Sequence, residues 1–287
     1  MGMEMRGRPR LAASAGAASL DLLQDAQAMF QAAYNWVLDW LAGMGQLVLF
    51  AKEVFLATFA HRSSGRTLLY QLYFIGVKSQ AVVIITGAFT GMVLAAQTYF
   101  QFHKVHMDTA TLAVVSVSMC SELGPVLTGL MVAGRVGAAL AAELGTMRVT
   151  EQIDALRTLA THPVDYLVVP RTLATVLAMP LLTALSIAVG IGAAYLVAVR
   201  FLGIEPAYTW QHTITFTDLR QPIMGFIKAV LYGAIIGLIS CYKGMTCGEG
   251  AEGVGRATTE AVVYSSITIL VSNFFLTLLL NRVLPAL

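Results

Sequence analysis

The stretch TLATVLAMPLLTALSIAVGIGAAYLVAV, residues 172–199, runs for 28 residues without a charged side chain. A helix needs about 20 predominantly apolar residues to cross the hydrocarbon core of a bilayer, so this stretch is long enough to span one. Within lipid a helix pairs its own backbone groups, whereas unpaired groups would cost several kcal/mol each. The stretch therefore predicts a transmembrane helix.

Four further windows of comparable length have the same character: residues 79–102, 109–134, 221–242 and 261–281. The only charged residues inside them are Glu122 and Lys228. Together with residues 172–199, these windows predict five transmembrane helices. The predicted fold class is therefore an all-α integral membrane protein.

The composition of the whole chain agrees with this class. Of 287 residues, 57% are hydrophobic and 12% are charged, whereas a soluble domain carries about 25% charged residues. A soluble globule could not cover so much apolar surface. The composition excludes a soluble enzyme, a disordered chain and a nucleic-acid-binding protein.

The chain divides into three predicted regions. Residues 1–19 hold three arginines among small residues and predict a mobile basic tail. Residues 20–60 are amphipathic, with Trp36 and Trp40 at a spacing that suits the headgroup layer. We predict that residues 20–78 form an interfacial or membrane-docking helical region. An additional irregular span in this region remains an alternative. Residues 79–287 form the five-span domain.

The distribution of lysine and arginine predicts the orientation. With five spans, 13 of the 18 basic residues fall on the same side as the N-terminus. Because cytoplasmic loops carry an excess of Lys and Arg, the N-terminus is expected in the cytoplasm and the C-terminus outside.

The longest cytoplasmic connection, residues 135–171, contains a candidate surface helix. Gly145 interrupts a helical pattern, Thr146 or Thr150 is a candidate cap for a new helix, and Pro163 is expected to end it. The apolar residues of this helix share one face and the charged residues line the rest. Such a helix suits docking to a soluble partner, although a solvated loop is the alternative.

A second cytoplasmic connection, residues 243–260, contains Gly248, Gly250 and Gly253 in a formal GxGxxG pattern. It follows a membrane span rather than a strand, and its two interleaved glutamates would repel a pyrophosphate. We predict a flexible linker. The chain also has no GxxxxGK[ST] motif, so no ATP site of that kind is expected in it.

Glu122 and Lys228 are the two charges inside predicted spans. A lone charge at the bilayer centre costs at least about 2.5–3.5 kcal/mol, so such residues face a bundle interior, a cavity or each other. We interpret them as a polar station in a transport pathway, with Pro125 helping to kink the helix of Glu122. The alternatives are that Lys228 reaches the outer interface and that Glu122 is structural, either hydrogen-bonded or protonated.

Several long blocks stand out between Leu72 and Leu279: TGAFTGMVLAAQ at 86–97, SELGPVLTGLMVAGRVGAALAAELGTMRVTEQIDAL at 121–156, PRTLA at 170–174 with MPLLT at 179–183, and GVGRATTEAVVYSS at 253–266. In this order, the blocks resemble those of the MlaE permeases. These permeases are the membrane subunits of ABC systems that work with MCE proteins.

The resemblance implies a five-span permease with an N-terminal interfacial helix in the bacterial inner membrane. It implies a homodimer that binds a cytoplasmic ABC ATPase, a periplasmic MCE-domain hexamer and phospholipid, with a STAS-domain protein on the ATPase. ATP and Mg²⁺ would belong to the ATPase, and no cofactor or metal to this chain. The complex would move glycerophospholipids between the inner membrane and the outer-membrane pathway and so maintain outer-membrane lipid asymmetry.

The resemblance also assigns roles to residues. The lipid-pathway residues would be Glu122, Lys228, Leu94, Gln101, Phe102 and Val105, with Ser121 and Pro125 beside the glutamate. The ATPase-coupling residues would be Glu143, Gly145, Met147, Arg148, Thr150, Glu151, Gln152, Asp154 and Leu156. Some relatives have arginine in place of Ser121, so here Lys228, water or another group would neutralise the glutamate or contact a phosphate.

Two other functions remain open from the residues alone. The first is an ion-coupled secondary transporter of an apolar or amphipathic solute, with Glu122 as the protonation site; five spans do not divide evenly into an inverted repeat. The second is a membrane-embedded lipid enzyme, for which the sequence offers no nucleophile and base at one depth.

Overall fold

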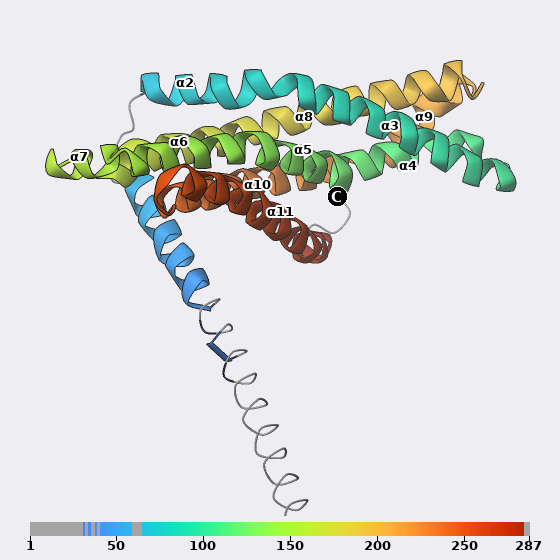
Figure 1. Cartoon of the computed structure of the whole chain (residues 1–287). Coiled ribbons are helices and arrows are strands. Elements are labelled where there is room, and N and C mark those ends of the chain that lie inside the picture. Colours follow the sequence, from blue (N-terminus) through green and yellow to red (C-terminus); the bar gives the residue numbers. More distant parts are fainter. Residues whose placement is uncertain (1–30, 32–33, 36–37, 39–40, 59–64, 284–287) are drawn as a thin grey trace, which may run out of the picture. The chain divides into compact units, whose positions relative to one another are not determined.

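The structure is a computed structural model that describes residues 31, 34–35, 38, 41–58 and 65–283 (Figure 1). Within these ranges all regular secondary structure is helical, which confirms the predicted fold class. The predicted tail at residues 1–19 lies outside the described residues, as do Trp36 and Trp40.

Six helical segments are long and apolar enough to cross a membrane: Leu41–Thr58, Gly65–Val105, Asp108–Val149, Val164–Arg200, Arg220–Met245 and Gly250–Val283. Each of the five predicted windows falls within one of the last five segments. Leu41–Thr58 is an additional candidate inside the region predicted to be interfacial. The chain divides into two compact units, Met1–Lys52 and Glu53–Leu287, and the other five segments belong to the second unit.

The first long segment of that unit begins well before the predicted window. It joins α2 (Gly65–Gly76), the short turn η1 (Val77–Ser79), α3 (Gln80–Phe102) and the turn η2 (His103–Val105). The predicted boundary between residues 78 and 79 therefore lies inside this helical segment. Lys78 carries a charge but lies over the ring of Phe74, with Nζ 5.0 Å from the ring centroid, and the helix continues past it.

The second long segment contains two wide turns. It runs through η3 (Asp108–Ala110), α4 (Thr111–Ser118), the π-helical turn η4 (Met119–Leu123), α5 (Gly124–Val132), the π-helical turn η5 (Ala133–Gly137) and α6 (Ala138–Val149). Pro125 follows η4 directly. Proline has no N–H and crowds the carbonyl four residues earlier, so a wider turn before it lets the helix continue.

The helical break in the cytoplasmic connection differs from the prediction. Gly145 lies inside α6, where a Cβ would meet Cys247 and Val254 at 3.4 Å, so the glycine serves close packing. The break comes at Glu151, whose φ is 59°, and α7 spans Gln152–Thr158. Neither Thr146 nor Thr150 caps α7, because both hydroxyls donate to carbonyls four residues earlier.

Pro163 does not end this helix either. The helix α7 is already complete at Thr158, and Ala160 then adopts a φ of 56°. Pro163 instead precedes the π-helical turn η6 (Val164–Val168), which leads into α8 (Val169–Arg200). The fixed φ of proline suits the start of a helix, where its missing N–H would have no helical partner.

Close packing between helices depends on glycine and small residues. The helix α3 lies along α8, where a Cβ on Gly87 would approach the Ser186 carbonyl oxygen to 2.8 Å and one on Gly91 would overlap the Gly190 carbonyl. The helix α10 (Arg220–Met245) packs on α8 in the same way through Gly233. Gly87 and Gly91 on α3, and Gly233 and Gly237 on α10, are each four residues apart and serve packing within the bundle.

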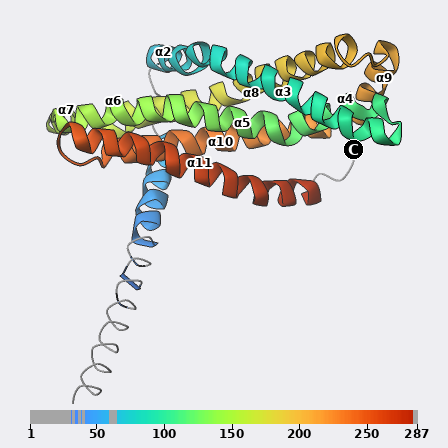
Figure 2. The same ribbon diagram turned by 45° about the vertical axis from the view of Figure 1, so that its right-hand side comes forward.

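The two ends of the bundle are distinct (Figures 1 and 2). The helix α7 and the turn between α10 and α11 (Gly250–Val283) share one end. The helix α9 (Pro206–Phe216) lies at the other end, against η3 and α4. The two connections predicted to be cytoplasmic therefore lie at the same end.

The connection at residues 243–260 is not a flexible linker. The helix α10 extends to Met245 and α11 begins at Gly250, so only residues 246–249 separate them. Gly250 has a φ of +73°, which favours glycine, and a Cβ on Gly253 would overlap the Gly248 carbonyl oxygen. The GxGxxG pattern therefore forms a tight turn between two helices. The prediction considered whether a strand precedes the glycines, and that criterion does not distinguish a tight turn from a flexible linker.

Candidate functional site

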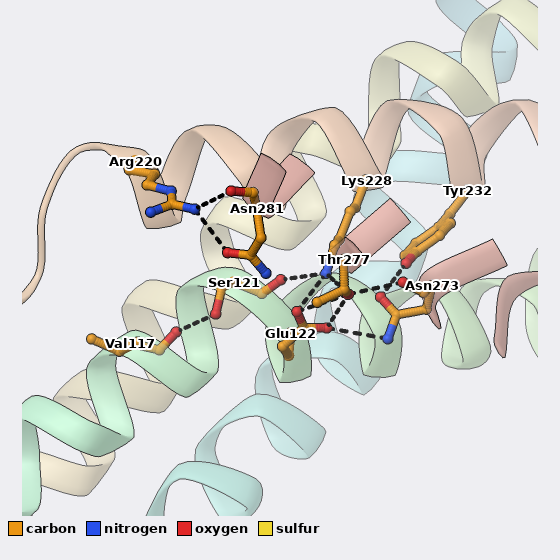
Figure 3. Close-up of polar contacts among 9 residues, drawn as sticks. All are labelled: Val117, Ser121, Glu122, Arg220, Lys228, Tyr232, Asn273, Thr277 and Asn281. Carbon is orange, nitrogen blue, oxygen red and sulfur yellow. Dashed lines mark hydrogen bonds and ion pairs between the residues drawn. The ribbon is translucent and has the colours of Figure 1, made fainter. Parts of the chain in front are cut away.

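An ion pair inside the helix bundle joins the two charges that the sequence singled out. Lys228 Nζ on α10 lies 2.7 Å from Glu122 Oε1 on the π-helical turn η4 (Figure 3). The Lys228 side chain is fully buried and that of Glu122 is 33% exposed. Lys228 therefore does not extend to the outer interface. A paired, hydrogen-bonded arrangement is what charges in a low-dielectric interior require.

The Lys228 ammonium has an acceptor for each of its three hydrogens. Besides Glu122, Nζ donates to the Ser121 carbonyl oxygen at 3.0 Å and to Thr277 Oγ1 at 2.8 Å. The Ser121 carbonyl would normally accept the N–H of residue 125, but that residue is Pro125. Pro125 thus leaves the Ser121 carbonyl without its helical partner, and Lys228 supplies a donor to it. This is how Pro125 contributes to the site.

The helix α11 supplies polar groups that the sequence analysis missed. Thr277 Oγ1 lies 3.0 and 3.2 Å from the two carboxylate oxygens of Glu122. Asn273 Nδ2 donates to Glu122 Oε2 at 3.1 Å, and the Tyr232 hydroxyl donates to Asn273 Oδ1 at 2.7 Å (Figure 3). A signal was present, because Asn273 and Thr277 are four residues apart and so share a helix face, as do Lys228 and Tyr232.

The site is built where α10 comes very close to the π-helical turn η4. A Cβ on Gly225 of α10 would overlap the carbonyl oxygen of Cys120 in η4. The wide turn η4 presents its carbonyls toward α10, and Gly225 lets α10 approach them. One helical turn later, Lys228 then reaches Ser121 and Glu122 without extending through lipid.

The other predicted lipid-pathway residues lie apart from the ion pair. Leu94 of α3 packs on an apolar cluster that includes Met119, with Leu123 also against it, next to Glu122 along the chain. Gln101, Phe102 and Val105 lie at the far end of the same helical segment, where Gln101 and Val105 are exposed. None of the hydrogen bonds or ion pairs among the described residues joins these three to the site.

The predicted coupling residues surround the break between α6 and α7. Arg148 Nη1 lies 3.3 Å from Asp154 Oδ1, and Arg157 Nη1 lies 2.8 Å from the same oxygen. The first pair holds α7 to the end of α6, and the second lies within α7. Thr150, Glu151 and Gln152 are exposed at this end, whereas Gly145 is buried and Met147 and Leu156 are half-buried.

A second contact joins α6, near this end of the bundle, to α8. Arg171 on α8 has a side chain that is 6% exposed, and its Nη2 lies 2.8 Å from Glu143 Oε1 on α6. Its Nη1 donates to the Leu167 carbonyl oxygen at 2.8 Å. A nearly buried arginine therefore joins α6 to α8, and its planar guanidinium can bond both partners at once.

The α10–α11 turn lies beside the coupling residues. Cys247 Sγ contacts the Gly145 carbonyl oxygen at 3.5 Å, and Glu260 pairs with Lys243 at 2.7 Å and with Arg256 at 2.9 Å. A recess of about 340 Å³ opens beside these residues. The cytoplasmic end predicted from the sequence therefore includes α11 as well as α6 and α7.

Comparisons with known proteins agree with this architecture. Residues 68–279 match the family model described as Permease MlaE. The chain is 48% identical over 216 residues to a probable ABC transporter permease protein of Rickettsia typhi, covering 75% of this chain and 83% of the relative. It is 37% identical over 211 residues to the intermembrane phospholipid transport system permease protein MlaE of Haemophilus influenzae, covering 73% and 81%.

A plant relative is also similar. The chain is 37% identical over 228 residues to the chloroplastic protein TRIGALACTOSYLDIACYLGLYCEROL 1 of Arabidopsis thaliana, covering 79% of this chain and 65% of that protein. The region that matches the family model, residues 68–279, contains the ion pair, the α11 residues bound to it and the α6–α7 end.

Proposed function

The chain belongs to the MlaE permease family, a family of multi-pass inner-membrane transport subunits, and from this premise we propose that it moves glycerophospholipids in an ATP-driven complex. The observation that carries the proposal is the Glu122–Lys228 pair, which places two charges inside the spans at a site lined by apolar helices. Intramembrane ionisable residues mark substrate pathways by default. A lipid, with a polar head and apolar tails, matches both parts of this site.

The proposed complex assigns the ATP chemistry to another chain. A separate cytoplasmic ABC ATPase would bind ATP and Mg²⁺ and dock on the α6–α7 end. Two copies of this chain would form the membrane part, with a periplasmic MCE-domain hexamer outside and a STAS-domain protein on the ATPase. We propose a cytoplasmic N-terminus, a periplasmic C-terminus and a role in outer-membrane lipid asymmetry. The excess of lysine and arginine on the predicted cytoplasmic side supports the orientation, and the description of the Haemophilus influenzae relative supports phospholipid as the cargo.

Purification of the chain from its native membrane in mild detergent tests the proposal. We expect an ATPase to co-purify, its hydrolysis to increase when phospholipid is added, and phospholipid to be retained in the complex. A lone chain that catalyses ion-dependent flux of lipid or solute without an ATPase would contradict the proposal and favour the secondary transporter.

The substitution Glu151→Lys tests the docking surface. Glu151 is exposed at the α6–α7 break, and its left-handed backbone is as costly for lysine as for glutamate, so the fold should be retained. Reversal of one charge at an interface places like charges together and costs several kcal/mol. We expect at least about a tenfold loss of co-purified ATPase, measured by quantitative pull-down.

Glu205→Lys is the matched control, because Glu205 precedes α9 at the opposite end of the bundle. This control should retain the ATPase fully. Equal retention in both variants, with lipid-stimulated hydrolysis intact, would show that Glu151 does not contribute to the contact.

A further inference from the structure

The helix α11 contributes two side chains to the ion pair without contributing a charge. Asn273 and Thr277 are both half-buried and lie one turn apart on a helix whose neighbouring residues, Phe274 and Leu278, are exposed apolar side chains. The lipid-pathway residues predicted from the sequence lie on α3, η2, η4, α5 and α10, and none lies on α11. The hydrogen bonds of α11 show what this helix contributes to the site.

The carboxylate of Glu122 is held at both oxygens. Oε1 accepts from Lys228, Oε2 accepts from Asn273, and Thr277 Oγ1 lies within hydrogen-bonding distance of each. A carboxylate paired with lysine alone could rotate, because an ammonium is a compact charge without a preferred plane. The second oxygen is fixed from α11.

The orientation of the Asn273 amide is itself determined. The Tyr232 hydroxyl donates to Oδ1, which leaves Nδ2 to donate to Glu122. Tyr232 is fully buried and lies on α10, one turn from Lys228. A closed circuit of contacts therefore runs from Lys228 through Glu122, Asn273 and Tyr232 back to α10.

Thr277 bridges the two charges. Its hydroxyl oxygen accepts a hydrogen from Lys228 Nζ. The one hydroxyl hydrogen is shared between Glu122, at 3.0 Å, and the Asn273 carbonyl oxygen one turn earlier on α11, at 2.8 Å. Of the three acceptors around Nζ, Thr277 belongs to α11 and Glu122 is oriented by α11, whereas the Ser121 carbonyl is independent of it. The position of α11 thus determines whether the ammonium has a hydrogen free for another anion.

We propose that Asn273 and Thr277 are positioning residues for the lipid pathway, which hold Glu122 against Lys228 so that a lipid phosphate gains Lys228 only when α11 moves away. The inference rests on the proposed function for its substrate. In the closed arrangement the phosphate competes with Glu122 and Thr277. An apparent affinity is lowered in proportion to the fraction of protein in the competent state.

Carbodiimide labelling tests the positioning without any lipid. Dicyclohexylcarbodiimide is an apolar reagent that adds to carboxyl groups, and a carboxyl group whose two oxygens are both engaged by hydrogen-bond donors is less available to it. For the purified complex at neutral pH, we expect slow labelling of Glu122 by peptide mass spectrometry. The rate should rise several-fold in Asn273→Leu and Thr277→Val and stay at the wild-type value in Thr277→Ser, which restores the hydroxyl. Equal rates in all four proteins would overturn the proposal.

Lipid-stimulated ATP hydrolysis tests the consequence for the substrate. In Thr277→Val, the phospholipid concentration for half-maximal stimulation should fall about twofold to tenfold, the effect of one lost hydrogen bond. In a Glu122→Gln background the same substitution should have a smaller effect, because only the contact of Thr277 with Lys228 then remains to be lost. An effect as large as in the wild-type background would contradict the inference.

The two measurements separate two kinds of failure. If the wild-type complex shows no phospholipid stimulation, the proposed function is wrong, while the labelling rates still decide whether α11 positions Glu122. If stimulation is present and the labelling rates are equal, the proposed function stands and the positioning role is wrong.

Discussion

The substitution Lys228→Met is expected to destabilise the folded chain by about 3–5 kcal/mol and to abolish lipid transport. Methionine has a similar length but no charge, so the substitution leaves the Glu122 carboxylate without its counter-ion inside the bundle. It also removes the donor to the Ser121 carbonyl that Pro125 leaves unpaired. The measurement is the unfolding midpoint of the purified chain in mild detergent, together with transport by the reconstituted complex.

A double substitution distinguishes loss of the pair from loss of packing. In Glu122→Gln with Lys228→Met both charges are gone, and replacing a whole buried pair by neutral groups is often close to neutral in stability. We expect the double variant to recover most of the stability but not the transport. Lys104→Met, at an exposed position, should change stability by less than about 0.5 kcal/mol. A double variant no more stable than the single one would contradict the pairing.

The membrane helices were predictable because their signal is local. Each of the five windows lies within one long helical segment, since 20 or more consecutive apolar residues have few alternatives to a membrane helix. The ends were less predictable. The segment Gly65–Val105 continues through Lys78, whose charge lies over the ring of Phe74. A window defined by the absence of charge ends at Lys78, because this contact cannot be read from the sequence.

The candidate site was predictable in its charges but not in its partners. Glu122 and Lys228 stood out because charged residues are rare and costly within spans. Asn273 and Thr277 are polar but uncharged, and membrane helices tolerate such residues in many places. Their role depends on the face that α11 turns toward η4, which is a tertiary property. Similarly, Gly145 was interpreted through its low helix propensity, whereas packing against Val254 decides its place in α6.

The packing of α3 on α8 gives the second large expected effect. We expect Gly91→Ala to destabilise the chain by about 3 kcal/mol or more, because its added Cβ would overlap the Gly190 carbonyl. The obstacle is backbone, so no side chain can rotate away, and the two helices would have to separate along their contact. The loss should appear as a lowered unfolding midpoint in detergent and a lowered yield of assembled complex.

Gly192 provides a matched control on α8, two positions beyond the contact residue Gly190. A Cβ there would meet no atom within 4 Å, so Gly192→Ala should stabilise the chain by about 0.5–1 kcal/mol through the higher helix propensity of alanine. The same chemical change thus carries opposite signs at two positions near one contact. A Gly91→Ala variant as stable as the wild type would show that α3 and α8 do not approach this closely. The packing of α8 that positions η4 against α10 would then have to be revised as well.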